Sequence, residues 1–261
     1  MVLSMKNKTV MTFFRVGEGE CRLRLTVASD LHNSPYEDIL PLIREACPDA
    51  IVVPGDLCGA LCEASEPGGE VTSRYIEESR KNDVGFAFIA EAAKIAPVYC
   101  SVGNHEVSVS PSNRARYTQA GAVLLDNSYV RLGDFLLGGL TTGGAHGLWH
   151  KSNAPDLAWL ESFARLDGRK ILLSHHPEYW ERHIIGMDIF LTVSGHAHGG
   201  QWRAFGRGLF APGQGLFPRY TSGVHRRGEQ YLAISRGLRK ETEVPRINNP
   251  PELITIDIMY N

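Results

Sequence analysis

Side chains that bind divalent metal ions fall at five turns along the chain, and each turn directly follows a short apolar run. These side chains are Asp30 and His32, Asp56, Asn104 and His105, His175, and His196 and His198. Carboxylate and amide oxygens and imidazole nitrogens together suit divalent metals. One such residue alone is typical of an ordinary turn. The joint occurrence, which includes six of the ten histidines when His176 is counted, predicts a metal centre.

The apolar runs that precede these turns are typical of buried strands. They span residues 24–30, 50–56, 97–104, 170–175 and 189–196. Their apolar residues are nearly continuous, which indicates sheets that are covered on both faces. Helical segments are expected between them, at 36–47, 74–95, 112–120 and 155–166. In an α/β sheet the residues just past the carboxyl ends of the strands converge on one crevice, so the five turns are expected to meet at a single site.

Further strand-like runs are separated by short turns instead of helices, so part of the sheet system is expected to be antiparallel. These runs span 122–125, 129–132, 135–140, 231–235 and 253–258. No repeat or flexible linker divides the chain, which favours one domain over residues 1–261. A polar, glycine-containing stretch at 59–83 follows Asp56, and it is expected to be an insertion that forms either a lid or a plain surface loop.

The composition is that of an ordinary folded protein. The 261 residues are 43% hydrophobic and 21% charged, which excludes disorder, collagen and a coiled coil. The 27 Lys and Arg against 29 Asp and Glu give a net charge of -2. No run of basic residues is long enough to follow a nucleic-acid backbone or an anionic membrane, so no specific nucleic-acid partner is expected.

Features of targeting and secretion are missing from the sequence. No apolar stretch reaches the length of about 20 residues that spans a bilayer, and the N-terminus lacks the apolar core of a signal peptide. The five cysteines, an odd number, do not form the pattern of a disulfide framework. We therefore expect a cytoplasmic protein with no membrane span.

The turns resemble, in order, the five motifs of the calcineurin-like metallophosphoesterases. The matching residues are Asp30-x-His32, Gly55-Asp56, Gly103-Asn104-His105-Glu106, His175 and Gly195-His196-x-His198. The segments SGHAHGGQWR, GLFPRYTSGVHRRGEQYLAISRG and PPELITI resemble more narrowly the YkuE/YaeI-like phosphodiesterase branch, and the whole resemblance covers residues 22–258. It implies an α/β fold in which two mixed β-sheets pack as a sandwich flanked by helices, with the metal site at the carboxyl ends of the strands.

The resemblance also implies two divalent metal ions. One ion is expected to bind Asp30, His32 and His198, the second Asn104, His175 and His196, with Asp56 as the bridge. Two ions about 3.5–4 Å apart need a carboxylate between them to offset their repulsion. The set contains no thiolate, and its donors suit Mn, Fe or Zn better than a Mg ion that keeps most of its waters. A hydroxide held between the ions is then expected to attack phosphorus in line.

His105 is the histidine of the set that the resemblance leaves as a non-ligand, and it is expected to protonate the leaving alkoxide or to stabilise its charge. In protein-phosphatase relatives a carboxylate three positions after the bridging Asp orients this histidine, whereas Gly59 stands there in this chain. Either Glu106 or a residue elsewhere takes that role, or His105 acts as a fixed charge. Asn33 and His176 are expected to contact substrate, with a position behind the ligands as the alternative for His176.

The resemblance implies a phosphoesterase that hydrolyses phosphodiester or pyrophosphate bonds of a small or lipid-linked substrate. A phosphomonoesterase or a Ser/Thr protein phosphatase is the enzymatic alternative, although Leu57-Cys58-Gly59 replaces the Val-Asp-Arg-Gly continuation of the latter. A non-catalytic metal-binding scaffold is the alternative from a different class. Loss of catalysis normally removes ligands, and here all seven ligand positions are filled.

Overall fold

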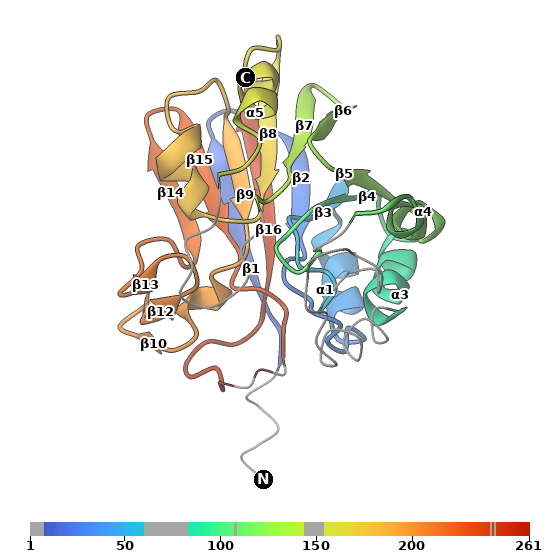
Figure 1. Ribbon diagram of the computed structural model, residues 1–261, viewed down its shortest axis with the longest axis vertical. Helices are drawn as coiled ribbons and strands as arrows, with labels where there is room; N and C mark the ends of the chain where they lie inside the picture. The colour runs from blue at the N-terminus through green and yellow to red at the C-terminus, as the bar shows by residue number, and fades with distance from the viewer. Residues whose placement is uncertain (1–7, 60–82, 107–108, 144–153, 241, 243) are drawn as a thin grey trace.

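Two mixed six-stranded sheets lie face to face at the centre of the molecule (Figure 1). The computed structural model describes residues 8–59, 83–106, 109–143, 154–240, 242 and 244–261. The first sheet has the order β1-β16-β2-β3-β4-β5 and the second β14-β15-β9-β8-β7-β6. The first sheet consists of β1 Val10–Gly17, β2 Glu20–Val27, β3 Ala50–Val53, β4 Val98–Ser101, β5 Ala122–Leu125 and β16 Glu252–Tyr260. The second consists of β6 Ser128–Leu132, β7 Phe135–Leu140, β8 Arg169–Ser174, β9 Leu191–Ser194, β14 Gly223–Arg227 and β15 Gln230–Ile234.

Parallel strands form the middle of each sheet. Strands β2 to β5 pair in parallel, and so do β7, β8, β9 and β15. Antiparallel pairs occur between β16 and β2 in the first sheet and at both edges of the second. The parallel strands bring the loops that follow β2, β3, β4, β8 and β9 to one edge of the sandwich, as the sequence predicted.

Three hydrophobic clusters hold the layers together. The central cluster lies between the sheets and includes Val27 and Val52 of the first sheet with Leu137, Leu173 and Val193 of the second, all 0% exposed. Strands whose two faces are both covered need apolar residues in succession, which explains the continuous runs in the sequence. The other two clusters lie under the helices on the outer faces.

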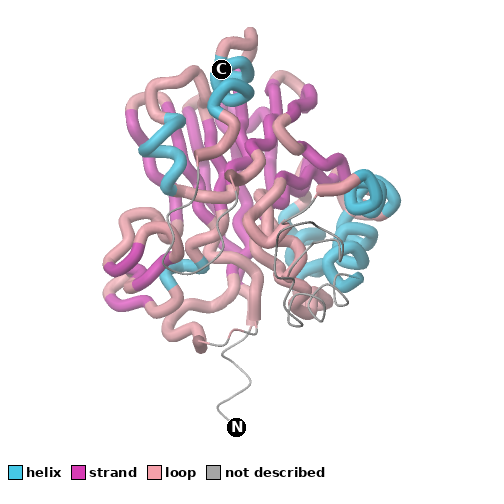
Figure 2. The backbone as a smooth tube through the Cα atoms, viewed as in Figure 1, coloured by secondary structure: helices cyan, strands magenta, loops and turns pink. Residues whose placement is uncertain are grey.

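Helices cover both outer faces of the sandwich (Figure 2). The first sheet is covered by α1 Ile39–Ala46, α3 Asp83–Ala92 and α4 Pro111–Gln119, and the second by α5 Leu157–Ala164 and a π-helical turn, η2 Trp180–Ile184. Helix α4 begins where the Ser110 side chain accepts a hydrogen bond from the backbone of Asn113, and α5 begins at Asp156 in the same way. The sandwich flanked by helices confirms the predicted fold class.

Several elements differ from the sequence-based expectations. The edge strand β1 was not expected. It pairs in parallel with β16 from the other end of the chain, so no local turn in the sequence indicates it. The predicted helix 74–95 is described only from Asp83, where α3 begins. Residues 60–82 lie outside the described residues, so the lid at 59–83 and the single domain over 1–261 stay predictions.

A further small region follows β9 and was also not expected. A short 3₁₀ turn, η3 His198–Gly200, leads into two hairpins. The first pairs β10 Arg203–Ala204 with β11 Arg207–Gly208, and the second pairs β12 Phe210–Ala211 with β13 Gly215–Leu216. Strands of two residues leave no alternating pattern in the sequence.

Helices of membrane-spanning length and hydropathy do not occur in the part of the chain that the structure describes.

The two sheets approach each other closely where Gly139 of β7 faces Leu125 of β5. A Cβ at Gly139 would collide with the backbone carbonyl oxygen of Leu125, which cannot turn aside. We expect Gly139→Ala to lower the free energy of unfolding by about 1–3 kcal/mol in urea titrations, because overpacking must part the sheets. The nearest atoms to a Cβ at the neighbouring Gly138 belong to the ring of Phe163 and not to backbone, so Gly138→Ala should cost less. Equal stabilities of the two variants would contradict this view of the interface.

Candidate metal centre

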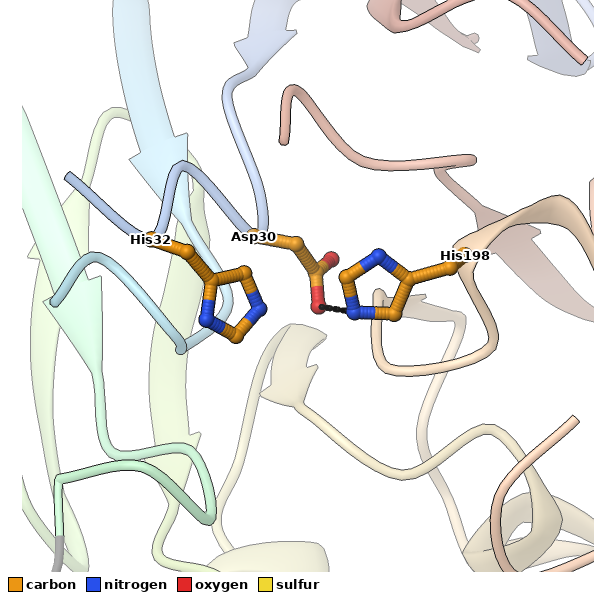
Figure 3. Close-up of side chains that lie close together, drawn as sticks. All are labelled: Asp30, His32 and His198. Atoms are coloured by element: carbon orange, nitrogen blue, oxygen red, sulfur yellow. Dashed lines mark ion pairs between the residues drawn. The ribbon is translucent and has the colours of Figure 1, made fainter. Parts of the chain in front are cut away.

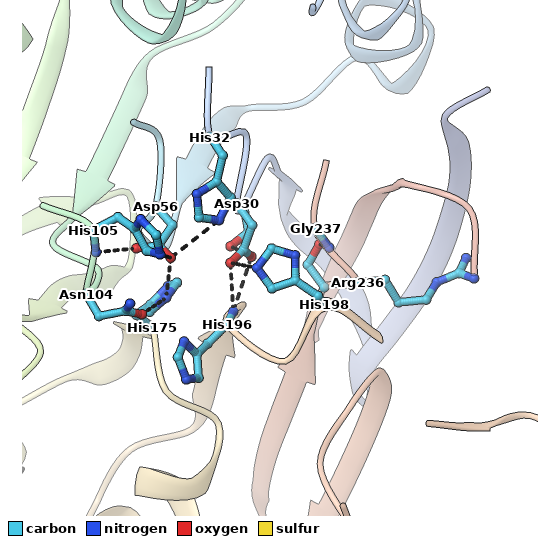
Figure 4. Close-up of polar contacts among 12 residues, drawn as sticks. Asp30, His32, Asp56, Asn104, His105, His175, His196, His198, Arg236 and Gly237 are labelled. Carbon is cyan, nitrogen blue, oxygen red and sulfur yellow. Dashed lines mark hydrogen bonds and ion pairs between the residues drawn. The ribbon is translucent and has the colours of Figure 1, made fainter. Parts of the chain in front are cut away.

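The predicted ligands converge on one site between the loops at the carboxyl edge of the sandwich (Figure 4). Asp30 and His32 follow β2, Asp56 follows β3 and Asn104 follows β4, while His175 and His196 follow β8 and β9 and His198 lies in η3. Both sheets therefore contribute donors. The crevice that the strand order predicted is the place where they meet.

Asp30, His32 and His198 form one group that could hold a metal ion (Figure 3). A carboxylate oxygen of Asp30 lies 3.6 Å from Nε2 of His198, and the rings of His32 and His198 stack with centroids 5.1 Å apart. Asp30 is fully buried, and it also accepts hydrogen bonds from the Ser29 hydroxyl and the His196 backbone N–H. These bonds fix the carboxylate so that its remaining lone pairs face the two imidazoles.

Asp56, His175 and His196 form a second group of possible ligands. Nε2 of His175 lies 3.1 Å from Asp56 Oδ2 and 3.0 Å from Asn104 Oδ1. The other nitrogen of His175, Nδ1, hydrogen-bonds the Pro54 carbonyl at 3.0 Å, which fixes the ring with Nε2 directed into the site. The amide oxygen of Asn104 thus lies beside the second group, and its role as a ligand stays a prediction.

Asp56 stands between the two groups. Its Oδ2 lies 3.1 Å from His175 of the second group and 3.5 Å from Nε2 of His32 in the first. Its Oδ1 accepts a hydrogen bond from the backbone N–H of His105 at 2.9 Å. Among the described acids that form these groups, Asp56 is the one within 4 Å of donors from both, which is the position of a bridging ligand.

The backbone at the site is held in an unfavourable conformation. Of the described non-glycine residues with positive φ, six lie at the site: Asp30, His32, Asn33, Asp56, His196 and His198. Left-handed backbone is uncommon outside glycine, and Asp, Asn and His are the other residue types that adopt it most readily, so six of them together mark an unusual local backbone. Close approach adds to this constraint, since a Cβ at Gly195 would collide with the Asp30 carboxylate and one at Gly103 with that of Asp56.

The charge states of these groups follow from burial and from their neighbours. Burial, with the neighbouring cationic groups, lowers the pKa of His32, His196 and His198 well below the usual value, so these imidazoles are neutral. Burial raises the pKa of Asp30. For Asp56 burial acts in the same direction, but the charges of His175 and His105 outweigh it and hold the pKa well below the usual value. The Asp56 carboxylate likewise outweighs burial at His175 and raises its pKa to about 9.

These residues fit divalent metal ions. Both ring nitrogens of His32 are buried and make no hydrogen bond within the described part of the chain. A buried imidazole without partners is costly, whereas a neutral imidazole is a good ligand for Mn, Fe or Zn. The set of buried carboxylates, imidazoles and one amide oxygen is therefore better explained by ions than by the hydrogen bonds among its members.

His105 lies beside this site and is oriented by a backbone group. Its Nδ1 lies 2.5 Å from the carbonyl oxygen of Gly59, and its Nε2 lies 3.9 Å from Asp56 Oδ2. A carbonyl can only accept, so Nδ1 carries the hydrogen and Nε2 faces the site. The glycine that stands where protein phosphatases have a carboxylate thus supplies its carbonyl instead, and Glu106 has a different role.

Glu106 ties two of the ligand-bearing loops together. Its Oε2 accepts hydrogen bonds from the backbone N–H groups of Asp56 at 2.9 Å and Gly103 at 2.8 Å, and its Oε1 accepts one from Cys58 at 3.2 Å. Burial, together with the nearby Asp56 charge, raises the pKa of Glu106 to about 7. The sequence placed Glu106 in a motif, but two of its three partners lie 48 and 50 residues away, so the link to the Asp56 loop was not predictable.

The two predicted substrate contacts lie in different surroundings. The backbone N–H of Asn33 donates to the Leu57 carbonyl at the edge of the site. His176 is 1% exposed, and its ring lies 4.0 Å from that of His196, with Glu178 3.3 Å from its Nδ1. His176 is thus behind a predicted ligand, which favours the alternative of a supporting position, and both contacts stay predictions.

Arg246 is a neighbour of the site that sequence reasoning missed. A guanidinium nitrogen of Arg246 lies 3.3 Å from Nδ1 of His198, and Arg246 also donates to the carbonyls of Arg236 and Gly237. No motif surrounds Arg246 in the sequence, and the tertiary fold alone brings it to His198.

Comparison with known proteins agrees with this geometry. The sequence model of the family described as calcineurin-like phosphoesterase matches residues 23–200 of the chain. The matched range contains all seven predicted ligand positions and His105. The resemblance is thereby confirmed at the level of the superfamily, while the YkuE/YaeI-like branch stays a prediction. No match was found among curated proteins.

Glu106 offers a test of how the ligand loops are held. In Glu106→Gln the amide nitrogen must face at least one of the three N–H groups, which loses a hydrogen bond and leaves a buried donor unsatisfied. We expect the free energy of unfolding to fall by about 1–3 kcal/mol in denaturant titrations. Glu91→Gln, at an exposed helical ion pair with Lys94, is the matched control and should be neutral. Unchanged stability of Glu106→Gln would show that Glu106 does not hold the ligand loops together.

Proposed function

The chain belongs to the calcineurin-like phosphoesterase family, and on that premise we propose that it hydrolyses phosphodiester or pyrophosphate bonds of a small or lipid-linked substrate. Family membership supports a metal-dependent phosphoesterase in general. The preference for diesters is the finer part of the proposal, and the similarity of the C-terminal segments to the YkuE/YaeI-like branch motivates it.

The observation that carries the proposal is the pair of donor groups with Asp56 between them. In the proposed assignment Asp30, His32 and His198 hold one ion, Asn104, His175 and His196 hold the other, and Asp56 binds both. Mn, Fe and Zn suit these donors. Such ions, when bound, supply Lewis-acid activation of water and of the phosphoryl group.

The remaining chemistry falls to His105. The Gly59 carbonyl holds the hydrogen on Nδ1, so a protonated His105 has Nε2–H to give to the leaving oxygen as the bond to phosphorus breaks. The ring returns to the neutral form with the hydrogen still on Nδ1, ready to take a proton from water. The side chain of His105 is 33% exposed, so the ring is open to solvent and substrate.

A non-catalytic metal-binding scaffold is the alternative from another class. Left-handed backbone at five of the seven predicted ligands and the buried imidazole nitrogens of His32 without hydrogen bonds support metal binding, which an enzyme and such a scaffold share. Hydrolysis of a diester by the metal-loaded protein therefore decides between them.

The proposed function is tested by metal content and diester hydrolysis together. We expect the wild type, reloaded with Mn, to hold two ions per chain and to hydrolyse bis(4-nitrophenyl) phosphate. Asp56→Asn should lower the content of both ions and abolish hydrolysis, because Asp56 contacts donors of both groups. Asp30→Asn should mainly weaken one ion, because Asp30 belongs to a single group. A wild type that never holds more than one ion would refute the two-ion site. A wild type that cleaves only monoesters would refute the preference for diesters.

His105 is tested by changing the leaving group of the substrate. We expect His105→Ala to retain both ions and to lose activity by roughly 10²–10⁴-fold on alkyl esters, the usual range for a general acid. The loss should be much smaller for nitrophenyl esters, because nitrophenolate leaves without a proton. An equal loss with every leaving group would show electrostatic stabilisation instead, and loss of metal would show that His105 is a ligand.

A further inference from the structure

The two hairpins that follow η3 expose large apolar side chains at their turns. Phe205, between β10 and β11, is fully exposed, and Leu216 and Phe217, at the end of β13, are 68% and 80% exposed. Trp202, just before β10, is 43% exposed. We call Trp202, Phe205, Arg207, Leu216 and Phe217 the hairpin surface. In Figure 1 the hairpins project from the sandwich below β14 and β15.

Two of these rings occupy backbone positions that disfavour them. Phe205 has φ 51° and Phe217 has φ 53°, in the left-handed region where glycine and asparagine are the usual residues. Their rings are exposed, so packing within the molecule does not repay the strain. The two-residue turn between β10 and β11 needs positive φ at Phe205 and Gly206, and asparagine and glycine are the residues that usually supply it. Folding therefore explains the turn but not an exposed phenylalanine in it, and such a residue points to function.

The charge around the hairpin surface is positive. Residues 189–228 contain five arginines and no acidic residue, in a chain whose net charge is -2. Arg207 is exposed, and Arg203 donates to the carbonyls of Gly199 and Gly206, so among the residues that the structure describes neither forms an ion pair with an acid. Arg219 is paired with Glu181, and Arg226 is paired with Glu229. Projecting apolar side chains beside an exposed arginine without an acidic partner are the chemistry of a membrane interface.

The hairpin surface adjoins the metal centre. Residues Gly199 and Gly200 directly follow His198, and they accept hydrogen bonds from Arg203 at 2.8 Å and from the backbone of Leu209 at 3.1 Å. Leu209 joins the hairpins and also accepts from the backbone N–H of Phe217. The match to the family ends at residue 200, so the hairpins begin where that match stops.

We infer that the hairpin surface docks the protein on an anionic lipid bilayer, with Phe205, Leu216 and Phe217 inserted among the headgroups and Arg207 at their level. An anionic bilayer is favoured over a second protein because an exposed arginine without an acidic partner lies beside projecting apolar side chains. The surface contains a single arginine, so no run of basic residues marks it in the sequence. The idea that docking presents the metal centre to a lipid-linked phosphate rests on the proposed function. The docking itself does not depend on that function.

Sedimentation with lipid vesicles tests the inference. We expect wild-type protein to bind vesicles that contain about 30% anionic phospholipid, and to bind neutral vesicles much more weakly. The double variant Phe205→Asn/Phe217→Asn should lose at least tenfold in partitioning. Asparagine tolerates the left-handed region, so the turns are retained, and an unchanged Tm checks this. Arg207→Gln should lose about fivefold, the effect of one basic residue at an anionic surface, and added salt should weaken wild-type binding.

Matched control variants separate docking from general stickiness. Phe13→Asn removes a ring that is 55% exposed on β1, the edge strand of the first sheet. Arg165→Gln removes an exposed arginine at the end of α5, which covers the second sheet. Both should bind vesicles like the wild type. Failure of the wild type to bind anionic vesicles, or equal binding by the double variant, would overturn the inference. A concentration-dependent dimer that the double variant abolishes would assign the surface to a second copy and overturn it as well.

The vesicle experiment needs no catalysis, so its result and that of the diester assay are independent. Vesicle binding without hydrolysis would leave docking in place and refute the proposed function. Hydrolysis of the soluble diester without vesicle binding would support the proposed function and overturn the docking.

Discussion

The buried carboxylate of Asp56 is the group on which the arrangement of this site depends. A buried charge is tolerated only when its lone pairs are satisfied, and here the partners come from loops of both sheets. His105 provides a backbone N–H, and an imidazole nitrogen of His175 lies 3.1 Å away, while the backbone N–H of His32 donates to the Asp56 carbonyl oxygen at 3.1 Å. Each of these contacts fixes one loop relative to Asp56. The loops after β2, β4 and β8 are thereby brought into the register that two metal ions require.

The loop that carries Asp56 must also be held in place. Glu106 holds it by accepting hydrogen bonds from three backbone N–H groups, two of them in that loop. A carboxylate used in this way is not available to orient His105, and the Gly59 carbonyl does so instead. A neutral acceptor fixes the ring without adding another negative charge beside Asp30, Asp56 and Glu106. The departure of Gly59 from the protein-phosphatase pattern therefore agrees with the local charge.

The sequence predicted what depends on side-chain identity and on strand ends. The two-sheet fold was predictable because covered strands need continuous apolar runs, and the candidate ligands because carboxylates and imidazoles directly follow those runs. Contacts made by backbone atoms were not predictable. A glycine gives no sign that its carbonyl will hold His105, and nothing near Glu106 points to N–H groups 48 and 50 residues away. The hairpins also escaped prediction, because strands of two residues show no periodicity.

Strained backbone occurs at the metal centre and at the hairpins, but it has different support in the two places. At His196 and Asp56 the left-handed conformation is held by buried hydrogen bonds, from the His196 N–H to Asp30 and from the Asp56 N–H to Glu106. At Phe205 the ring is fully exposed, so packing of the side chain gives no comparable return. Strain of the first kind places ligands within a folded site. At the hairpin the turn itself uses the left-handed backbone, but the exposed ring gives folding no return, and a surface outside the molecule can receive it. This is why the hairpins point to a partner surface.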